Sequence, residues 1–303
     1  LAHHLPPRPL ARQGPRLRVH ANDPAFFTFF TSSVARATGL VPMHPLAALW
    51  RGLKVLLHLL TAFLLVALLI APARVLGRRF SYAPALSRWW YRRLCRILGL
   101  RLVVTGELAP GVLLVANHVS WLDIPVLGAQ GDLCFLSKAE IRAWPLIGWM
   151  AEVLGTLFIS RGAHQARGLA EQIAARARDG QVVVIFPEAT TSDGSWLRPF
   201  HPRLFAAAQD SGAALQPVAL RYGEPDHRDL IAPFIDADQP WPHLLRVLKH
   251  PGIRVEARFL PLIPSQGLDR KTMARACREA IGASLGLETD AGQSAAPRAD
   301  PDR

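Results

Sequence analysis

Acidic residues are missing from a long stretch near the start of this chain, because no Asp or Glu occurs between Pro24 and Gly106. The same stretch holds eleven Lys and Arg residues, nearly the whole formal net charge of +12. A basic segment of this kind attracts nucleic acid or anionic lipid headgroups. This one surrounds an apolar run and carries Trp89, Trp90 and Tyr91, so we favour membrane lipids as its partner.

Cysteine is scarce and forms no pattern. Cys95, Cys134 and Cys277 lie far apart, and the sequence has no CxxC pair. The chain is therefore predicted to have neither a disulfide framework nor a zinc site, and reduced thiols in a cytoplasmic domain are expected. Zinc-finger spacing, an RNA-binding aromatic motif and a basic zipper are also missing, so we expect no nucleic-acid partner.

One long run without formal charge, Val55–Ala73, is rich in Leu, Ala and Val. It approaches the ~20 residues that a membrane-spanning helix needs. We predict a membrane helix that either spans the bilayer or lies in its interface, with a buried core helix as the alternative. Arginines cluster after the run, and a spanning helix would therefore place its C-terminal side in the cytoplasm. Residues 86–100 are expected to form a short helix at the headgroup layer.

Composition divides the chain into four parts. Residues 1–42 are predicted to be a disordered or non-native extension, since a sequence typical of a natural start begins at Met43. Residues 43–100 are expected to form a membrane-anchoring helical segment. Residues 101–288 would form the domain that carries the chemistry, and residues 289–303 a disordered tail.

Short apolar runs alternate with helical stretches after Leu102. This alternation predicts an α/β domain with a central, mostly buried sheet flanked by helices. The predicted strands are 102–105, 112–116, 133–136, 182–186, 214–220 and 254–259. The predicted helices are 123–127, 166–178, 203–210 and 271–285.

The strand 112–116 leads into Asn117 and His118, followed by Ser120 and Asp123. A neutral imidazole can take a proton from a hydroxyl, and a carboxylate can orient that imidazole. Residues five apart on a regular helix differ by about 140°, so they do not share a face. We therefore expect His118 to precede a helix and Asp123 to reach back from its first turn, with Ser120 as the N-cap.

A second segment places Gly155 and a short strand before Arg161. The guanidinium of an arginine is a planar fork of donors that suits phosphate. The alternative is a solvated arginine at the end of a strand.

A third segment follows the strand 182–186 and carries Glu188, Thr190 and Thr191. The Glu188 carboxylate could bind a polyol, organise Arg161 or only cap the turn. In a fourth segment, Pro217 indicates that its strand lies at the edge of the sheet or forms a pocket wall.

In this order, the four segments resemble the glycerolipid acyltransferase family, which includes the 1-acylglycerol-3-phosphate acyltransferases. The family motif NHxSxxD is matched by Asn117, His118, Ser120 and Asp123; GxxFIxR by Gly155, Phe158, Ile159 and Arg161; and the apolar Pro-Val pair by Pro217 and Val218. The resemblance implies an α/β domain behind an N-terminal helical anchor. It also implies an acyl-CoA or acyl-carrier-protein donor, and no metal or other cofactor.

The third family motif, FPEGTRS, departs here at two positions, because Ala189 replaces its glycine and Thr191 its arginine. Alanine is a small change unless the backbone needs a positive φ. Threonine removes a cation at the place where the resemblance puts the phosphate of the acceptor. The TTSDG turn and the later Leu197–Phe200 segment also resemble the lyso-ornithine lipid acyltransferase branch, whose acceptor is an aminolipid without phosphate.

The resemblance implies transfer of a fatty acyl group to a lysolipid hydroxyl, with His118 as general base and Asp123 orienting it. The residues that it implies in substrate binding are Asn117, Ser120, Gly155, Arg161, Glu188, Thr190, Thr191 and Pro217. The predicted acceptor is 1-acyl-sn-glycerol-3-phosphate, giving phosphatidic acid, and lyso-ornithine lipid is the alternative. An alternative of another class is a catalytically inactive membrane lipid-binding protein. The protein is expected at the inner membrane, with its catalytic domain facing the cytoplasm.

Overall fold

The computed structural model describes residues 44–77, 83–143, 147–159, 163–235 and 238–288. The predicted extension 1–42 and the predicted tail 289–303 lie outside the described residues. Arg161 also lies outside them. The helices and strands described below all belong to one compact unit, Pro42–Arg303.

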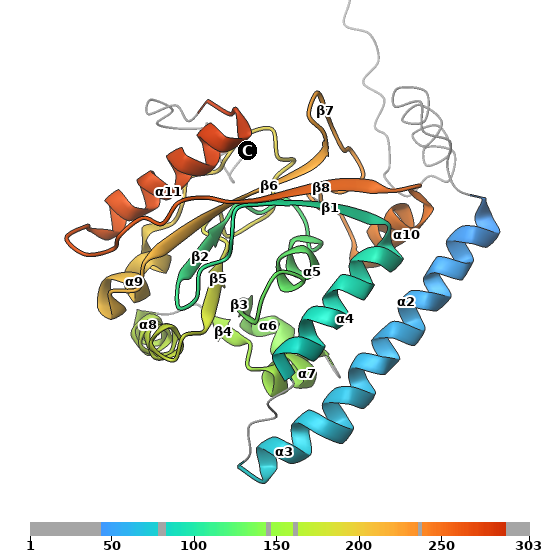
Figure 1. The fold of residues 1–303 in the computed structure, drawn as a ribbon, viewed down its shortest axis with the longest axis horizontal. Helices are drawn as coiled ribbons and strands as arrows, with labels where there is room; N and C mark the ends of the chain where they lie inside the picture. The colour runs from blue at the N-terminus through green and yellow to red at the C-terminus, as the bar shows by residue number, and fades with distance from the viewer. Residues whose placement is uncertain (1–43, 78–82, 144–146, 160–162, 236–237, 289–303) are drawn as a thin grey trace, which may run out of the picture. The chain divides into compact units, whose positions relative to one another are not determined.

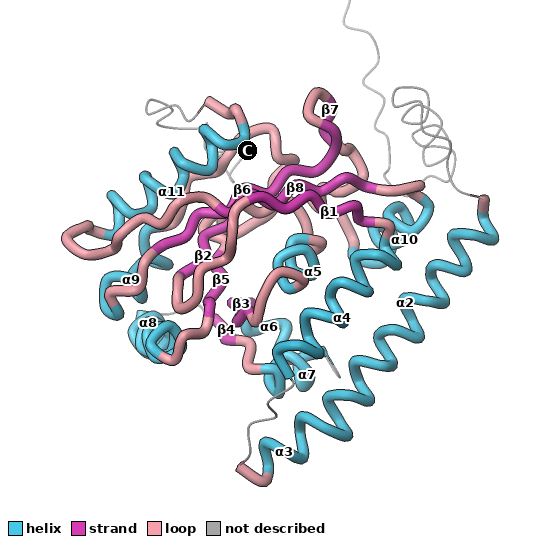
Figure 2. The backbone as a smooth tube through the Cα atoms, in the orientation of Figure 1, coloured by secondary structure: helices cyan, strands magenta, loops and turns pink. Residues whose placement is uncertain are grey.

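A central sheet organises this unit (Figures 1 and 2). Its strands pair in the order β1 (Leu100–Thr105), β8 (Ile253–Phe259), β6 (Leu215–Glu224), β2 (Leu113–Ala116), β5 (Val182–Ile185), β3 (Leu133–Lys138) and β4 (Leu157–Ile159), with β7 (His227–Arg228) paired to β6. Pairing is antiparallel between β6 and β8 and between β6 and β7, and parallel elsewhere. The predicted α/β fold with a mostly buried sheet is confirmed.

Hydrophobic side chains cover both faces of the sheet because successive residues of a strand point to opposite sides. In β2, Leu114 and Ala116 join one buried cluster, and Leu113 and Val115 join the other. Helices α4 (Ala83–Leu98), α5 (Asp123–Gly128) and α10 (Pro240–Lys249) contribute to the first cluster. Helices α8 (Ala163–Arg178), α9 (Ala206–Ser211) and α11 (Arg270–Leu285) contribute to the second.

Most predicted elements overlap observed ones, with a few differences. The predicted helix 203–210 begins as a 3-10 turn, Pro202–Phe205, before α9. Three helices were not predicted: α6 (Ala139–Arg142), α7 (Ile147–Leu154) and α10. The prolines of α10 resemble a helix breaker in the sequence, but Pro240 is the first helical residue, where its missing N–H costs nothing.

The apolar run lies in a continuous helix, Pro45–Ala73, which is long and apolar enough to cross a membrane. It consists of α2 (Pro45–Leu65), a π-helical turn (Val66–Ile70) and the start of α3 (Ala71–Val75). Only 28% of its most apolar window is buried, which argues against the alternative of a core helix. The leucines exposed on it are Leu46, Leu49, Leu53, Leu56, Leu57, Leu59, Leu60, Leu64, Leu68 and Leu69.

Helix α2 is attached to the rest of the unit by polar contacts as well as packing. The His58 ring stacks on the Trp90 ring of α4, with 4.7 Å between centroids. Trp90 Nε1 donates to the His58 carbonyl at 3.1 Å, and His58 Nε2 lies 3.0 Å from the Trp90 carbonyl. Nearer the start of α2, Arg51 donates to the His250 carbonyl at 2.6 Å. The His58 contacts hold α2 alongside α4, as Figure 1 shows, and the Arg51 bond attaches the start of α2 to the residue after α10.

The predicted edge position of Pro217 is wrong, because β6 lies between β8 and β2. Pro217 is tolerated there because it sits where the β8 ladder ends. Leu260 N donates to the Pro217 carbonyl at 2.9 Å. Gln216 Nε2 donates to the Leu260 carbonyl at 3.4 Å and so replaces the N–H that proline lacks.

Candidate active site

The site lies at the carboxyl end of β2, where open parallel sheets place their reactive groups. Strand β2 ends at Ala116, and α5 begins at Asp123. His118 lies in the loop between them, and its Nδ1 is 2.8 Å from Asp123 Oδ2. The side chain of His118 is 20% exposed, whereas that of Asp123 is fully buried. The structure therefore brings the predicted pair together, with Asp123 reaching back from the first turn of the helix.

This contact determines which nitrogen of His118 is available for chemistry. A carboxylate only accepts hydrogen bonds, so a neutral His118 carries its proton on Nδ1. The lone pair is then on Nε2, at the other side of the ring. Stacking also fixes the orientation of the His118 ring, because it lies on the Phe186 ring with 4.2 Å between centroids and 22° between planes.

The Asp123 carboxylate is held by four groups in total. Besides His118, Oδ2 accepts from Val119 N at 2.8 Å and from Ser120 N at 3.1 Å. Oδ1 accepts from the Tyr222 hydroxyl at 2.6 Å. These donors stabilise the ionised carboxylate in a fully buried position.

Ser120 is not the N-cap that its position predicts. The residue before α5 is Leu122, which makes no side-chain capping bond. Ser120 is fully buried, and its hydroxyl has no partner among the described residues. Instead of Ser120 accepting a bond from the helix, the Asp123 carboxylate of the helix accepts bonds from the backbone amides of Val119 and Ser120.

Glu188 holds the backbone of the loop. Its Oε1 accepts from His118 N at 2.7 Å, and its Oε2 accepts from Arg198 N at 2.9 Å. Of the three roles considered for this carboxylate, the geometry fits capping of the turn, because both oxygens bind backbone amides. Burial raises the pKa of Glu188 to about 6, although the two amides act in the opposite direction.

The Asn117 side chain forms hydrogen bonds within the sheet. Its Nδ2 donates to the Leu220 carbonyl at 3.0 Å, and its Oδ1 accepts from Leu220 N at 2.7 Å. The residue is only 1% exposed. Asn117 thus fastens the end of β2 to β6 and does not reach the surface, where an acceptor would bind.

The two departures from the third family motif have structural consequences. Ala189 has a φ of 60°, so this turn does require the left-handed conformation that glycine adopts more easily. Thr191 is half-buried, and its hydroxyl donates to the Phe234 carbonyl. This bond ties the turn to the segment 229–235. The same segment binds the loop that carries His118, because Phe234 N donates to the Val119 carbonyl at 3.0 Å.

Other predicted site residues are more scattered. Thr190 is exposed beside Ala189, and Pro217 is buried within the sheet. Gly155 precedes β4, which pairs with β3 near the end of that strand, so its role in substrate binding stays a prediction. Its role is a left-handed turn with a φ of 87°, whose carbonyl accepts from Cys134.

Tyr222 is the residue of this site that the motifs do not reveal. It lies near the end of β6, 99 residues from Asp123 in sequence. Burial and the neighbouring Asp123 charge raise its pKa well above the usual range, so it remains a donor at neutral pH. The sequence does show a tyrosine near the end of a buried apolar strand, but the spacing gives no indication that its partner is Asp123.

Comparison with known proteins decides the family. Residues 101–221 match the family model described as acyltransferase. A lyso-ornithine lipid O-acyltransferase from Pseudomonas aeruginosa is 49% identical over 202 residues, which cover 66% of this chain and 78% of that protein. The chain belongs to the acyltransferase family. This confirms the resemblance and the predicted enzyme class, and it favours an enzyme over an inactive lipid-binding protein.

Further relatives of this acyltransferase have two kinds of name. A lyso-ornithine lipid O-acyltransferase from Rhodobacter capsulatus is 36% identical over 240 residues, covering 77% of this chain and 86% of that protein. A 1-acyl-sn-glycerol-3-phosphate acyltransferase from Neisseria gonorrhoeae is 34% identical over 183 residues, covering 59% and 71%. The solved 1-acyl-sn-glycerophosphate acyltransferase of Thermotoga maritima shares the fold, with a TM-score of 0.52, 20% identity, and coverage of 78% of this chain and 96% of that one.

Proposed function

We propose that this acyltransferase moves a fatty acyl group from an acyl thioester to the hydroxyl of lyso-ornithine lipid, with His118 as general base. The observation that carries the chemistry is the 2.8 Å contact between His118 Nδ1 and Asp123 Oδ2. It leaves Nε2 as the basic nitrogen of a partly exposed ring that is held by Phe186 and Asp123.

The reaction needs no covalent enzyme intermediate, because a thioester is already activated. His118 Nε2 removes the proton of the acceptor hydroxyl as its oxygen bonds to the thioester carbonyl carbon. The carbon–sulfur bond then breaks, and the imidazolium returns the proton to the departing thiolate. Asp123 stabilises the imidazolium between these steps.

Several donors near His118 are already used in hydrogen bonds within the protein. The amides of His118, Val119 and Ser120 are already bonded to Glu188 and Asp123. The Asn117 side chain is bonded to Leu220. Asn117 therefore has no free donor for the oxyanion.

Lyso-ornithine lipid is preferred here over lysophosphatidate, the acceptor predicted first from sequence. Thr191 supplies no cation for a phosphate, and its hydroxyl is used by Phe234. The relatives from Pseudomonas aeruginosa and Rhodobacter capsulatus, which bear the lyso-ornithine name, match at higher identity and coverage than the Neisseria gonorrhoeae protein. Lysophosphatidate is the second candidate, supported by that Neisseria relative and by Arg161 in the second motif.

The acyl donor is an acyl-CoA or acyl carrier protein thioester, and no metal or other cofactor enters the proposed reaction. His201 and Cys134 provide no rival centre. His201 is exposed in a loop without a carboxylate partner among the described residues. Cys134 is buried, and burial raises the pKa of its thiol, so it is a poor nucleophile.

The enzyme is membrane-associated, and we propose that α2 lies in the interface of one leaflet. The unit contacts α2 along much of its length, through Arg51, His58 and Phe63, whose ring lies 6.0 Å from that of Trp149. If α2 crossed the bilayer perpendicular to its plane, α4 beside it would enter the hydrocarbon layer. Burying the arginines of α4 there would be costly. The leaflet proposed is the cytoplasmic one, where acyl thioesters are made.

The function is tested with the full chain in lipid–detergent micelles, a radiolabelled acyl thioester and both lysolipids. We expect transfer to lyso-ornithine lipid, and a loss of about 10³-fold or more in kcat for His118→Ala. His201→Ala is the matched control and should stay within about twofold. Near wild-type turnover by His118→Ala would refute the assigned base. Transfer to lysophosphatidate alone would refute the proposed acceptor.

A further inference from the structure

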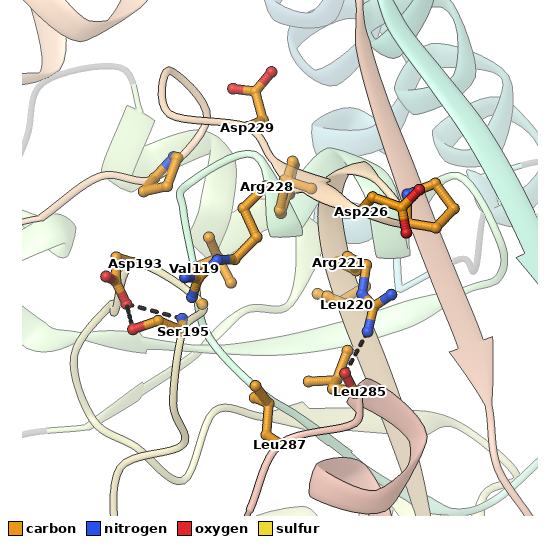
Figure 3. A pocket seen from close by; sticks show the side chains of 14 residues that line it. Val119, Asp193, Ser195, Leu220, Arg221, Asp226, Arg228, Asp229, Leu285 and Leu287 are labelled. Atoms are coloured by element: carbon orange, nitrogen blue, oxygen red, sulfur yellow. Dashed lines mark hydrogen bonds between the residues drawn. The ribbon is translucent and has the colours of Figure 1, made fainter. Parts of the chain in front are cut away.

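A cavity of about 270 Å³ opens beside the catalytic loop (Figure 3). Val119, the residue after His118, forms part of its wall. The turn Asp193–Ser195 forms another part and is attached to the loop, since Ser192 N donates to the His118 carbonyl at 2.9 Å. The end of β6, the β6–β7 hairpin, the last residue of α11 and Leu287 complete it. The cavity is thus adjacent to the loop that carries the base, at the carboxyl edge of the sheet.

Charges of both signs line this cavity. Arg221 and Arg228 bring guanidinium groups, and Asp193 and Asp226 bring carboxylates. In Figure 3 the Arg228 side chain reaches across toward Val119 and the Asp193–Ser195 turn. Asp229 also borders the cavity, but its carboxylate points away and accepts from Ile231 N and Ala232 N.

These charges form no ion pair with one another among the described residues, although, against the effect of burial, the Ser195 hydrogen bonds and, after them, the Arg228 charge lower the pKa of Asp193. In the described part of the chain, the Arg228 side chain makes no hydrogen bond or ion pair, and Arg221 donates to the Leu285 carbonyl instead of a carboxylate. Asp193 is fixed from one side only, because its Oδ1 accepts from Ser195 N at 2.9 Å and from Ser195 Oγ at 2.6 Å. Its Oδ2 accepts from no other described residue. A fixed acceptor therefore faces a cation across the cavity.

We propose that this cavity binds the amino-acid headgroup of the acceptor, with its carboxylate at Arg228 and its ammonium at Asp193. The proposal rests on the proposed function and identifies the headgroup subsite for it. A zwitterion offers one partner to each unpaired charge. A phosphate monoester offers only negative charge, so Asp193 and Asp226 would repel it.

The binding test uses a soluble probe and the full chain, so that it does not depend on turnover. Nα-butanoyl-ornithine keeps the carboxylate and the side-chain ammonium, whereas Nα-butanoyl-norvaline lacks that ammonium. Calorimetric titration should show that Arg228→Ala and Asp193→Asn each weaken the ornithine probe by about tenfold or more. Asp193→Asn should leave binding of the norvaline probe within about twofold of wild type.

Two exposed residues outside the cavity provide controls matched in charge, Arg275→Ala on α11 and Asp210→Asn on α9. Both should bind the ornithine probe as the wild type does, and thermal unfolding should show that all four variants are folded. Absence of probe binding by the wild type, or equal Kd values in the wild type and both cavity variants, would overturn the proposal.

Kinetics then separate this proposal from the proposed function. If wild-type enzyme acylates lyso-ornithine lipid, the two cavity variants should raise KM for that acceptor by about tenfold. An unchanged KM with intact wild-type activity would count against the cavity alone. Failure of the wild type to use lyso-ornithine lipid, with probe binding intact, would count against the proposed function alone.

Discussion

At the scale of single residues, the site depends on how firmly Asp123 is held. Its oxygens take four donors, and the one from Tyr222 comes from a different strand. A carboxylate fixed in this way keeps the imidazole in one orientation without reorganising during the reaction. Tyr222 therefore acts on the reaction through Asp123, as a positioning residue.

Replacing Tyr222 by Phe should lower kcat by about tenfold and leave KM for the acceptor nearly unchanged, because a hydrogen bond to a charged group is worth about 1.5–3 kcal/mol. Steady-state kinetics with varied acceptor would measure both constants. Tyr91→Phe is the control, since Tyr91 is half-buried in the same hydrophobic cluster but its hydroxyl makes no hydrogen bond to any described group. A Tyr222→Phe enzyme with wild-type kcat would show that the bond has no positioning role.

Glu188 predicts a pH dependence of stability. Burial raises its pKa from 4.5 to about 6, so the folded protein holds a proton that the unfolded chain loses. The folded state should therefore lose stability as pH rises between 4.5 and 6, by up to ~2 kcal/mol. Urea unfolding of wild type and Glu188→Gln across this range would detect it. The difference between the two free energies of unfolding should change with pH, and a constant difference would contradict the prediction.

At the scale of elements, α5 carries Asp123 and is positioned by α4. Close packing between the two helices occurs at Gly128, where an added Cβ would lie 2.5 Å from the Tyr91 ring. A side chain there would push α5 away from α4, and Asp123 is on the same short helix. The glycine at the end of α5 thus supports the geometry of the site at its start.

Gly128→Ala should lower the free energy of unfolding by about 1–3 kcal/mol through overpacking, and should also reduce kcat. Gly168→Ala in α8 provides a control of opposite sign, because its added Cβ meets nothing within 4 Å. There alanine should stabilise the helix by about 0.5–1 kcal/mol. Thermal or urea unfolding of both variants would compare them, and equal effects of the two changes would refute the packing argument.

At the scale of the whole molecule, the exposed leucines of α2 give the enzyme a large apolar surface. A surface of this kind marks a site of interaction with a membrane or another protein. The arginines that follow in α4 add attraction to anionic headgroups. Such an arrangement would keep the base near the hydroxyl of an acceptor that remains in the bilayer.

Leu56→Asp should weaken binding to phosphatidylcholine vesicles by about tenfold or more, since burying one leucine is worth about 1.5–3 kcal/mol. Leu56 is 64% exposed on α2. The control is Leu262→Asp, at a position 49% exposed and outside α2, which should bind as the wild type does. Sedimentation with vesicles would measure both. Equal loss in the two variants would show that the anchor does not bind through this helix.

The amino-acid sequence by itself determined what depends on local order along the chain. The run Val55–Ala73 is apolar over enough residues to require a helix, and strands alternating with helices require an α/β sheet. The His118–Asp123 pair could be predicted because a strand end and a helix start lie only five residues apart. The motifs around this pair were sufficient for the family.

Tertiary structure decided what depends on segments that are distant in sequence. Tyr222 reaches Asp123 across 99 residues, and Gln216 compensates for Pro217 only because Leu260 is its neighbour across the sheet. The same holds for Glu188, whose partners His118 and Arg198 converge on it from two loops. The mixed charges of the cavity come together from a turn, a strand and a hairpin. Spacing in sequence carries no information about such contacts, because they exist only once the sheet has formed.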